Sequence, residues 1–490
     1  MPSIKSFKSF VKNPELVEAV KAKKNPENAN FDKKILIIGY GSVGSAVLPL
    51  VLRHITADPK KVTVIEKDDH GKIFRKRNAG NGVKYVKKEI LPNNLEATLK
   101  QYTEAGGFVI DVSLNIAAHA IIEWCLKNNV MYLNTSHERW GDQQDEKIPD
   151  LSERTLFHTH NEIRKIGAKY PNAATICATS GANPGLVTHL TKAALLKIAA
   201  ETGVKVEEPT DKEGWAQLMK KLGVEVVHVA ERDTQIIDKP KMKDEFVNTW
   251  SVEGLWAEGR APSEMGYGTH EPKELENGTI QGPAAFLHQP GLTVLCKSWV
   301  PNGGPYNGFL VQHSEAITMS QFFETEDGKF RPSVYYVYQP TDGTLASIHE
   351  LRGRELDMQT KERIVKDEVV SGMDELGVLL ITNKGKAYWH GSQLDIDSAR
   401  KLIPGENATS LQVVANILGT IMWALQNPRK GYTEPEAMDH KFILEHAMPY
   451  LGPVPFVPTD WRPEEDKNRL YPRPFNKKSP NALENFRVWN

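Results

Sequence analysis

The glycine run G-Y-G-S-V-G at 39–44 constrains the fold of this 490-residue chain more than any other feature. It follows the apolar stretch Ile35–Ile38 and opens a helical pattern, and the acidic Glu66 closes the next apolar stretch. Glycines permit a tight turn and let backbone N–H groups approach a pyrophosphate, which the helix N-terminus stabilises. Glu66 can accept hydrogen bonds from an adenosine ribose and would repel a 2′-phosphate. We therefore predict a Rossmann domain that binds NAD; the alternative is an unrelated glycine turn.

Short apolar runs alternate with helical stretches such as Ala117–Lys127, which is typical of parallel βαβ units. The predicted strands are Ile35–Ile38, Val62–Ile65, Val83–Val86, Phe108–Val112, Met131–Leu133 and Thr175–Ala178. Several end in small polar residues, and ligands of open α/β sheets bind beyond the carboxyl ends of the strands. We expect the NAD contacts to be Gly39, Gly41, Ser42, Val43, Gly44, Glu66, Asp111, Ser113, Asn134 and Thr135.

The pattern changes after about Leu190, where Gly/Pro-rich loops join strands of a mixed or antiparallel sheet. The predicted strands there are Val224–Val229, Val294–Val300, Phe309–Gln312 and Tyr335–Tyr338, and a long helix follows at Thr409–Leu425. We predict an α/β protein with a Lys-rich leader at 1–33, a Rossmann domain at 34–190 and an α+β domain at 191–405. Residues 406–490 would return a helix to the Rossmann domain and end in an irregular, proline-rich tail from Gly431.

Composition narrows the class of protein. The net charge of −1 gives no overall attraction to nucleic acid or to a membrane surface. The three cysteines lie far apart and without a metal-binding spacing, which indicates reduced thiols, and no H-E-x-x-H or two-His helix spacing predicts a metal site. No nucleophile elbow or P-loop occurs, so the nicotinamide is the one strong reagent that the sequence offers. We expect a cytoplasmic enzyme that binds neither nucleic acid nor a membrane.

Two motifs could bind a cationic substrate. In N-P-G at 183–185, Asn183 could bind an amine, or could cap a helix that starts at Pro184. In V-N-T-W-S-V-E-G-L-W-A-E-G, an aromatic face and carboxylates suit an ammonium or iminium ion, although tryptophans are often core residues and glutamates are often solvated. The residues concerned are Trp250, Trp256, Glu245, Glu253 and Glu258.

Two polar segments could move protons. Glu231 and Asp233 lie in A-E-R-D-T-Q, and His313 and Glu315 lie in V-Q-H-S-E. A histidine beside a carboxylate is a candidate proton shuttle near neutral pH. A hydrogen-bonded structural histidine is the alternative.

Taken together, the motifs resemble bacterial homospermidine synthase from about Ile35 to Trp461. They are GYGSVG, NTSHERWGD, TSGANPGLV, HVAERDTQ, FVNTWSVEGLWAEG, GYGTHE, YNGFLVQHSEAIT, DELGVLL, GKAYWHGSQL and ATSLQVVANI. The resemblance implies a saccharopine-reductase-like architecture, in which an inserted α+β domain forms a homodimer interface and much of the active site. It also implies tightly held NAD. Putrescine would be oxidised to an imine, ammonia would leave, and a second putrescine would attack before reduction gives homospermidine; spermidine is an alternative donor.

The resemblance also assigns roles to individual residues. Trp250 becomes the cation–π residue, Glu258 lies beside the reacting amine, and His313 moves protons. Glu138 holds the distal ammonium at the outer end, while Glu231 and Asn183 bind the inner amine. The further substrate-binding residues are Asn115, Ser136 and Asp374.

The chain departs from the family pattern at two positions. Asn115 stands where an acid is expected, with Asp111 nearby, so the pattern leaves open which of the two contacts substrate. Arg139 stands where proline is usual, and its cation could compete with the substrate or point away.

Two other functions fit parts of the sequence. A saccharopine-type or carboxypolyamine dehydrogenase would need Arg or Lys to clamp a substrate carboxylate, and the candidate motifs are instead rich in Glu and Trp, with only Arg139 and Arg232 nearby. A non-catalytic NAD-binding sensor would need the glycine motif but no grouping of Trp250, Glu258 and His313.

Overall fold

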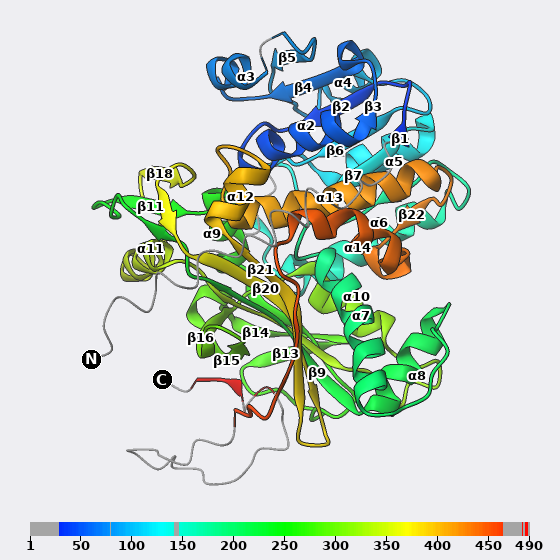
Figure 1. Ribbon diagram of the computed structural model, residues 1–490, viewed down its shortest axis with the longest axis vertical. Helices are drawn as coiled ribbons and strands as arrows, with labels where there is room; N and C mark the ends of the chain where they lie inside the picture. The colour runs from blue at the N-terminus through cyan, green and yellow to red at the C-terminus, as the bar shows by residue number, and fades with distance from the viewer. Residues whose placement is uncertain (1–28, 79, 142–146, 464–482, 484–485, 489–490) are drawn as a thin grey trace.

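The computed structural model describes residues 29–78, 80–141, 147–463, 483 and 486–488 and contains two large sheets (Figure 1). The first is a seven-stranded parallel sheet in the order β22-β8-β7-β6-β2-β4-β5. Its strands are β2 (Ile35–Ile38), β4 (Val62–Glu66), β5 (Lys84–Lys87), β6 (Phe108–Asp111), β7 (Met131–Asn134), β8 (Ile176–Cys177) and β22 (Tyr432–Thr433). The six strands predicted for this sheet all occur, with ends that differ by at most one residue. We call this sheet and its helices the cofactor half.

The apolar strands of the cofactor half are buried on both faces. Alternate residues of a strand point to opposite faces, so Ile35 and Ile37 enter one core while Leu36 and Ile38 enter another. The helices of this half are α2 (Ser42–His54), α3 (Gly71–Arg77), α4 (Leu95–Tyr102), α5 (Ala118–Asn128) and α6 (Leu156–Ala168). The predicted Rossmann architecture is confirmed.

The second sheet has ten strands, and it is mixed because β17 pairs parallel to β9 while its other pairings are antiparallel. Its strands are β9 (Val224–Asp233), β12 (Pro262–Gly266), β13 (Gly278–Gln281), β14 (Ala284–Pro290), β15 (Leu295–Val300), β16 (Gly304–Leu310), β17 (Ser333–Gln339), β20 (Met373–Thr382), β21 (Ala387–Asp395) and β23 (Phe456–Thr459). The strand predicted at Phe309–Gln312 begins earlier, at Gly304, and ends at Leu310. We call this sheet and the elements around it the substrate half.

The remaining helices pack on the second sheet, on the short strand pairs beside it, or between the two sheets. They are α7 (Leu186–Glu201), α8 (Lys212–Leu222), α9 (Val252–Arg260), α10 (Ser314–Phe322), α11 (Asp342–Gly353), α12 (Ile396–Leu402), α13 (Ala408–Gln426) and α14 (His440–Ala447). Helix α7 runs across residue 190, where the sequence placed a domain boundary. Helix α13 is apolar enough to cross a membrane by composition, but 89% of its most apolar window is buried, and it lies between the two sheets (Figure 1).

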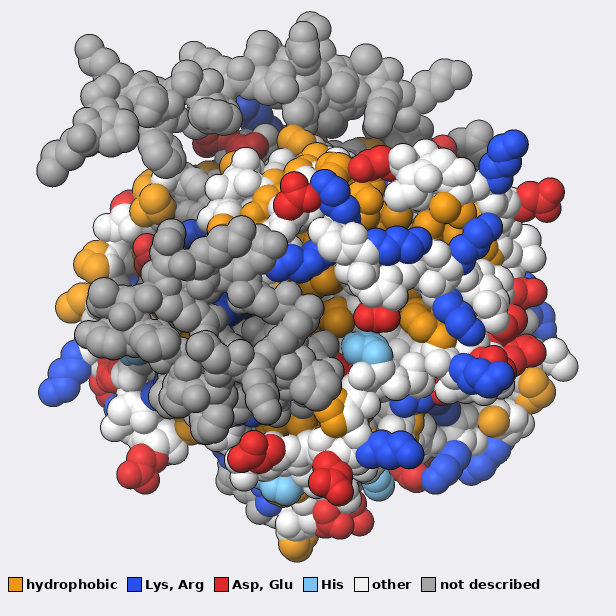
Figure 2. Space-filling view, turned by 90° about the horizontal axis from the view of Figure 1, so that it is seen from below, with side chains coloured by type: hydrophobic (Ala, Val, Ile, Leu, Met, Phe, Trp, Pro, Cys, Tyr) orange, Lys and Arg blue, Asp and Glu red, His pale blue; other side chains and the backbone are white. Residues whose placement is uncertain are grey.

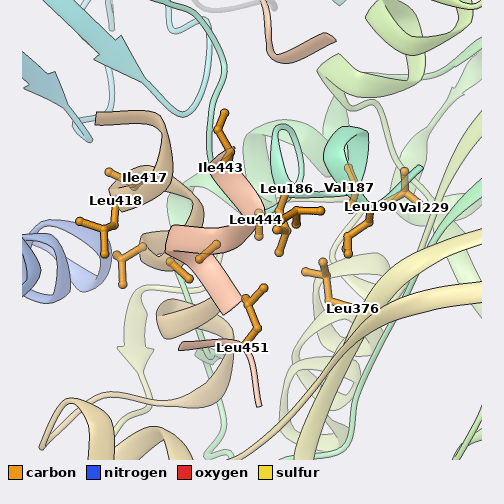
Figure 3. Close-up of a cluster of buried hydrophobic side chains, with 14 of the residues drawn as sticks. Leu186, Val187, Leu190, Val229, Leu376, Ile417, Leu418, Ile443, Leu444 and Leu451 are labelled. Atoms are coloured by element: carbon orange, nitrogen blue, oxygen red, sulfur yellow. The ribbon is translucent and has the colours of Figure 1, made fainter. Parts of the chain in front are cut away.

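The prediction of an irregular tail from Gly431 is wrong for the described residues. Ile443 and Leu444 of α14 and the following Leu451 are buried with α7 and α13 in a core that also receives Leu376 (Figure 3). Farther on, β23 forms an edge strand on β21, where a proline removes no hydrogen bond that the sheet needs. Pro435 and Pro449 fall at the starts of short helices and Pro458 at a sheet edge, so these prolines do not prevent regular structure.

Of the predicted leader, residues 1–28 lie outside the described residues, while β1 (Ala29–Asn30) pairs in parallel with β3 (Ile55–Thr56). Shorter pairs of strands are β10 (Ile236–Ile237) with β19 (Val369–Ser371), and β11 (Glu245–Asn248) with β18 (Lys361–Ile364). Acidic and basic side chains are interspersed on the described part of the face seen in Figure 2, in keeping with the small net charge.

Candidate active site

The glycine loop leaves space in front of α2. Gly39 has φ +97°, and a Cβ atom there would lie 2.7 Å from the carbonyl oxygen of Val112. A Cβ atom on Gly44 would collide with the carbonyl of Gly39, so this glycine allows close packing of helix and strand. A Cβ atom on Gly41 would meet nothing within 4 Å. The first turn of α2, with Ser42 and Val43, therefore opens onto space that a pyrophosphate could fill.

Glu66 lies at the end of β4, beside this loop. Its Oε2 accepts a hydrogen bond from the backbone N of Tyr40 at 2.6 Å, and its Oε1 accepts one from the N of Asp68 at 3.0 Å. Each carboxylate oxygen retains a lone pair for a ribose hydroxyl. The glycine loop and Glu66 together fit an adenine dinucleotide.

Polar residues at the ends of β6 and β7 shape the adjoining loops. Asp111 accepts hydrogen bonds from Ser113 Oγ at 2.6 Å and from Tyr132 OH at 2.8 Å, and burial raises its pKa to about 6. Asn134 Oδ1 accepts from the N of Thr179 at 2.7 Å, and its Nδ2 donates to the carbonyl of Ser136 at 2.6 Å. The intervening Thr135 is half-buried. The hydrogen bonds from Ser113 and Tyr132 thus hold the carboxylate of Asp111 in place at the end of β6.

A first group of carboxylates, the outer acids, lies beyond these strand ends. Glu138 accepts hydrogen bonds from Ser136 Oγ at 2.8 Å and from the N of Asn115 at 3.4 Å, and Asn115 Nδ2 donates to Glu253 at 2.5 Å. Burial raises the pKa of Glu138 to about 7, and the nearby Asp111 and Glu253 add to this shift. Asn115 rather than Asp111 therefore lies among the outer acids.

Local geometry accounts for both departures from the family pattern. Asn115 has φ +63°, a left-handed conformation that asparagine tolerates better than most residues. Arg139 directs its guanidinium to the carbonyl of Glu153 at 2.7 Å and to Thr159 at 3.2 Å.

A second group, the inner acids, lies on β9 and β20. Glu231 Oε2 accepts hydrogen bonds from Asn183 Nδ2 and from Tyr336 OH, both at 2.9 Å, and burial raises its pKa to about 7. The alternative role of Asn183 as a helix cap is wrong, because α7 begins at Leu186 after Gly185, and the Asn183–Pro184 peptide bond is cis. Asn183 is instead free to orient Glu231.

Asp233 and Asp374 also belong to the inner acids. They are directly opposite each other in the β9–β20 register, and both lie within hydrogen-bond distance of Thr409 Oγ1, at 3.2 and 2.7 Å. Burial raises the pKa of Asp374 well above its usual range, and Glu231 and Asp233 add to this shift. Asp374 Oδ1 is buried and has no hydrogen-bond partner. Asp233 also accepts hydrogen bonds from Gln235 and Thr249, so Asp374 is the incomplete member of the pair and favours a shared proton or a cation.

His313 lies between two carboxylates. Its Nδ1 is 2.6 Å from Glu315 Oε2, and its Nε2 is 3.8 Å from Glu258 Oε1. Burial alone would lower the pKa of His313, but Glu315 and Glu258 raise it to about 9. The side chain of Glu258 is 26% exposed, yet surrounding protein raises its pKa to about 7, and its Oε2 has no partner. The pair therefore offers an acid and a base with separated pKa values.

Aromatic side chains connect these groups. Trp250 Nε1 donates to Tyr338 OH at 3.1 Å, the rings of Tyr338 and Tyr336 stack with centroids 5.6 Å apart, and Tyr336 lies 4.5 Å from the ring of His313. Neither tyrosine is among the site residues predicted from the sequence. Their spacing in Y-Y-V-Y, which places Tyr336 and Tyr338 on one face of a strand, was the available signal.

Other residues of the tryptophan motif lie elsewhere. Trp256 packs under the guanidinium of Arg260 at 4.0 Å and donates to the carbonyl of Leu356, while Glu245 pairs with Arg363 at 2.8 Å. Arg232, the residue between Glu231 and Asp233, donates to the carbonyl of Gly303. Within the described residues, no group of three or more His, Cys, Asp or Glu side chains is arranged to hold a metal ion.

A cavity of about 860 Å³ opens elsewhere, beside α6, α10 and the end of α13. Its lining includes Arg164, Trp423 and Glu434, and none of the predicted site residues line it. Arg164 and Glu434 neutralise each other at 2.7 Å. The chemical grouping of acids, His313 and Trp250 therefore identifies the candidate active site better than cavity size does.

Comparison with known proteins agrees with this architecture. Residues 35–178 match the family model of the saccharopine dehydrogenase NADP binding domain, and residues 181–454 match that of the saccharopine dehydrogenase C-terminal domain. A homospermidine synthase from Mesorhizobium japonicum is 38% identical over 93% of this chain and 96% of its own length. One from Blastochloris viridis is 37% identical over 94% of this chain and 99% of its own.

Solved structures give the same result. A homospermidine synthase from Legionella pneumophila, solved in complex with NAD, superposes with a TM-score of 0.87 at 37% identity, covering 95% of this chain and 99% of that one. Saccharopine dehydrogenase (L-Glu forming) from Saccharomyces cerevisiae shares the fold alone, with a TM-score of 0.51 at 11% identity over 87% of this chain and 100% of that one. The chain belongs to the homospermidine synthase family.

Proposed function

We propose that this chain is a homospermidine synthase that transfers an aminobutyl group from putrescine, or from spermidine, to putrescine. The observation that carries the proposal is the gathering of buried carboxylates with raised pKa values around Trp250 and His313. Burying several carboxylates without cations is costly, and diamines are dications at neutral pH. A polyamine would supply the charges that this site lacks.

NAD is the proposed cofactor. The open space before Gly41 and the carboxylate of Glu66 at the end of β4 support it, as does the NAD complex of the Legionella relative. Bound NAD would accept a hydride in the first half-reaction and return it in the second. The further proposed contacts are Gly39, Ser42, Val43, Gly44, Asp111, Ser113, Asn134 and Thr135.

The proposed chemistry balances without a net redox change. The neutral amine of one putrescine loses a hydride from the carbon beside nitrogen and becomes an iminium ion. The neutral amine of a second putrescine adds to that carbon, ammonia leaves, and a new iminium ion forms. Return of the hydride gives homospermidine.

The residues would divide the work as follows. Glu258 accepts the proton that the reacting ammonium must lose, and His313 gives a proton to the departing ammonia. The indole face of Trp250 stabilises the iminium ions. Glu231, oriented by Asn183, and Asp374 bind the inner amine, while Glu138 with Ser136 and Asn115 binds the distal ammonium at the outer acids.

Two alternatives have less support. A saccharopine-type or carboxypolyamine dehydrogenase needs a cation to clamp a substrate carboxylate, and Arg139 and Arg232 are directed to backbone carbonyls instead. A non-catalytic NAD sensor would not need His313 between two carboxylates. The buried acid groups therefore favour polyamines on both sides of the reaction.

We also propose a cytoplasmic homodimer. Cys125, Cys177 and Cys296 are free and buried, as in proteins of a reducing compartment. Exposed apolar side chains occur on and beside the short strand pairs of the substrate half, and they are candidate dimer contacts: Ile236, Met242, Ile364 and Val370. Sedimentation of the purified protein would test the dimer.

Incubation of the purified protein with putrescine and NAD tests the function directly. We expect homospermidine and ammonia by mass spectrometry and no net rise in nicotinamide absorbance. Stoichiometric NADH without homospermidine would contradict the proposal and indicate a plain dehydrogenase. Trp250→Phe should slow turnover and Trp250→Glu should nearly abolish it; full activity of both would remove the cation–π role.

A further inference from the structure

A lysine of the substrate half contacts the helix that follows the glycine loop. Lys366, in the loop between β18 and β19, donates from Nζ to Ser45 Oγ at 2.9 Å and to the carbonyl of Ser42 at 3.3 Å. Both serines lie in the first turns of α2, directly after Gly41. The same ammonium is 2.6 Å from Glu406 Oε2, at the N-terminal end of α13.

Glu406 balances this lysine against a second cation. Its carboxylate is fully buried, and its Oε1 accepts from Arg77 of α3 at 2.8 Å and from Ser45 at 3.3 Å. A buried carboxylate is stable only while its cationic partners stay in place. Lys366 comes from the substrate half and Arg77 from the cofactor half, so Glu406 holds the two halves together beside the proposed pyrophosphate position.

The next residue extends this contact to the candidate active site. Asn407 Nδ2 donates to the carbonyl of Val365 at 2.8 Å and to the carbonyl of Thr249 at 2.6 Å, and its Oδ1 caps α13 at the N of Ser410. Thr249 immediately precedes Trp250. A continuous set of contacts therefore joins α2, Lys366, Glu406 and the residue before the indole.

We propose that Lys366, Glu406 and Asn407 form a latch that keeps the substrate half closed over bound NAD and slows its release. The inference rests on the proposed function, in which the same NAD must stay bound between the two half-reactions. Release of NAD would then require the halves to separate at α2, and separation would strand Glu406 with one cation fewer. These are positioning residues; they are not required to touch the reacting atoms.

The dissociation rate of NADH from the holoprotein tests the latch. We would load the protein with NADH, mix it with excess NAD and follow nicotinamide fluorescence over time. Lys366→Met and Glu406→Gln should each release NADH about tenfold faster or more, and Lys366→Arg should restore most of the slow release. The matched control is Arg164→Met, because Arg164 also joins the halves, from α6 to Glu434 and to Gln321 of α10, but far along the chain from α2.

Three outcomes would overturn the latch: unchanged release from both Lys366→Met and Glu406→Gln, equally fast release from Arg164→Met, or no recovery with Lys366→Arg. Thermal melting of the cofactor-free variants separates a local effect from general unfolding, since the latch predicts faster release from protein that still melts cooperatively. The proposed function is judged separately, by whether the unaltered enzyme makes homospermidine. If the unaltered enzyme makes homospermidine but releases NADH as rapidly as the Lys366 and Glu406 variants do, the latch alone is contradicted.

Discussion

Glu66 of the cofactor half and three carboxylates of the substrate half differ in how their oxygens are hydrogen-bonded. In the cofactor half, both oxygens of Glu66 accept hydrogen bonds from backbone N–H groups. In the substrate half, Glu258 Oε2, Glu315 Oε1 and Asp374 Oδ1 are buried without partners. The first arrangement is complete in itself and presents a fixed acceptor to a neutral ribose. The second is electrostatically incomplete, which is what recognition of a polycation requires.

Filling the space before α2 should have the largest effect of the changes predicted here. It should weaken NAD binding and leave the substrate half unchanged. A Cβ atom on Gly41 meets nothing within 4 Å, although its φ of −77° and ψ of −144° lie outside the usual β region. Gly41→Val should weaken NAD binding by about a hundredfold or more, because the side chain occupies the expected pyrophosphate position. Titration calorimetry with NAD measures this.

Gly353→Val is the matched control, since a Cβ atom on Gly353 of α11 also has open space around it. If Gly41→Val binds NAD as tightly as Gly353→Val does, the cofactor does not lie where the glycine loop indicates.

Glu258→Gln should have the next largest effect, on the substrate half. It preserves shape but removes the base beside the reacting amine, so kcat should fall about 10²- to 10⁴-fold while NAD binding is unchanged. Glu245→Gln, two residues before the same sequence motif and paired with Arg363, should leave kcat within a fewfold of the unaltered enzyme. Equal losses of kcat in both variants would contradict the separate roles assigned to Glu258 and Glu245.

The pH dependence of kcat/KM should report the acid and base of the substrate half. The pKa of Glu258 is about 7, so activity should rise as pH passes through this value and the carboxylate ionises. The pKa of His313 is about 9, so activity should fall above this value as the imidazolium loses its proton. In His313→Gln the fall of kcat/KM near pH 9 should disappear. Ionisation of the substrate amines affects the profiles of the variant and of the unaltered enzyme equally, so it does not account for the difference. A fall that persists unchanged would remove the assigned role of His313.

The smallest effect should be a gain in stability. The pKa of Asp374 is raised in the folded protein, so its ionisation costs stability as pH rises above the value for the unfolded chain. Asp374→Asn should raise the free energy of unfolding by about 1 kcal/mol near pH 8 and by less near pH 5. The exposed Asp357→Asn is the control. A melting temperature below that of the unaltered protein near pH 8 would contradict the incomplete charge balance of the inner acids.

The same contrast explains what the sequence could predict. The parallel sheet and the residues proposed to bind NAD could be predicted because they belong to contiguous motifs. In these motifs the strand, glycines, helix and acid follow one another along a single βαβ unit. The acid groups depend on pairing between distant strands. Nothing local distinguishes Glu258, beside His313, from Glu245, beside Arg363.

The remaining features also depend on strand register and on tertiary packing. Asp233 meets Asp374 only because β9 and β20 align at those positions. The contact of Lys366 with Glu406 and the packing of α14 likewise depend on tertiary neighbours. Apolar residues at helical spacing in K-F-I-L-E-H-A were a signal for α14 that the surrounding prolines obscured.

The central claim is that one bound NAD accepts the hydride and returns it. The most direct test follows that hydride as deuterium. Putrescine deuterated on both carbons that bear nitrogen would be incubated with enzyme already loaded with NAD and with an excess of unlabelled NADH in solution. If the hydride is transferred to an NAD that stays bound and is then returned to the iminium ion, the homospermidine formed should keep every deuterium. Homospermidine that has lost one deuterium to hydrogen would show that the cofactor exchanges between the half-reactions and would contradict the account.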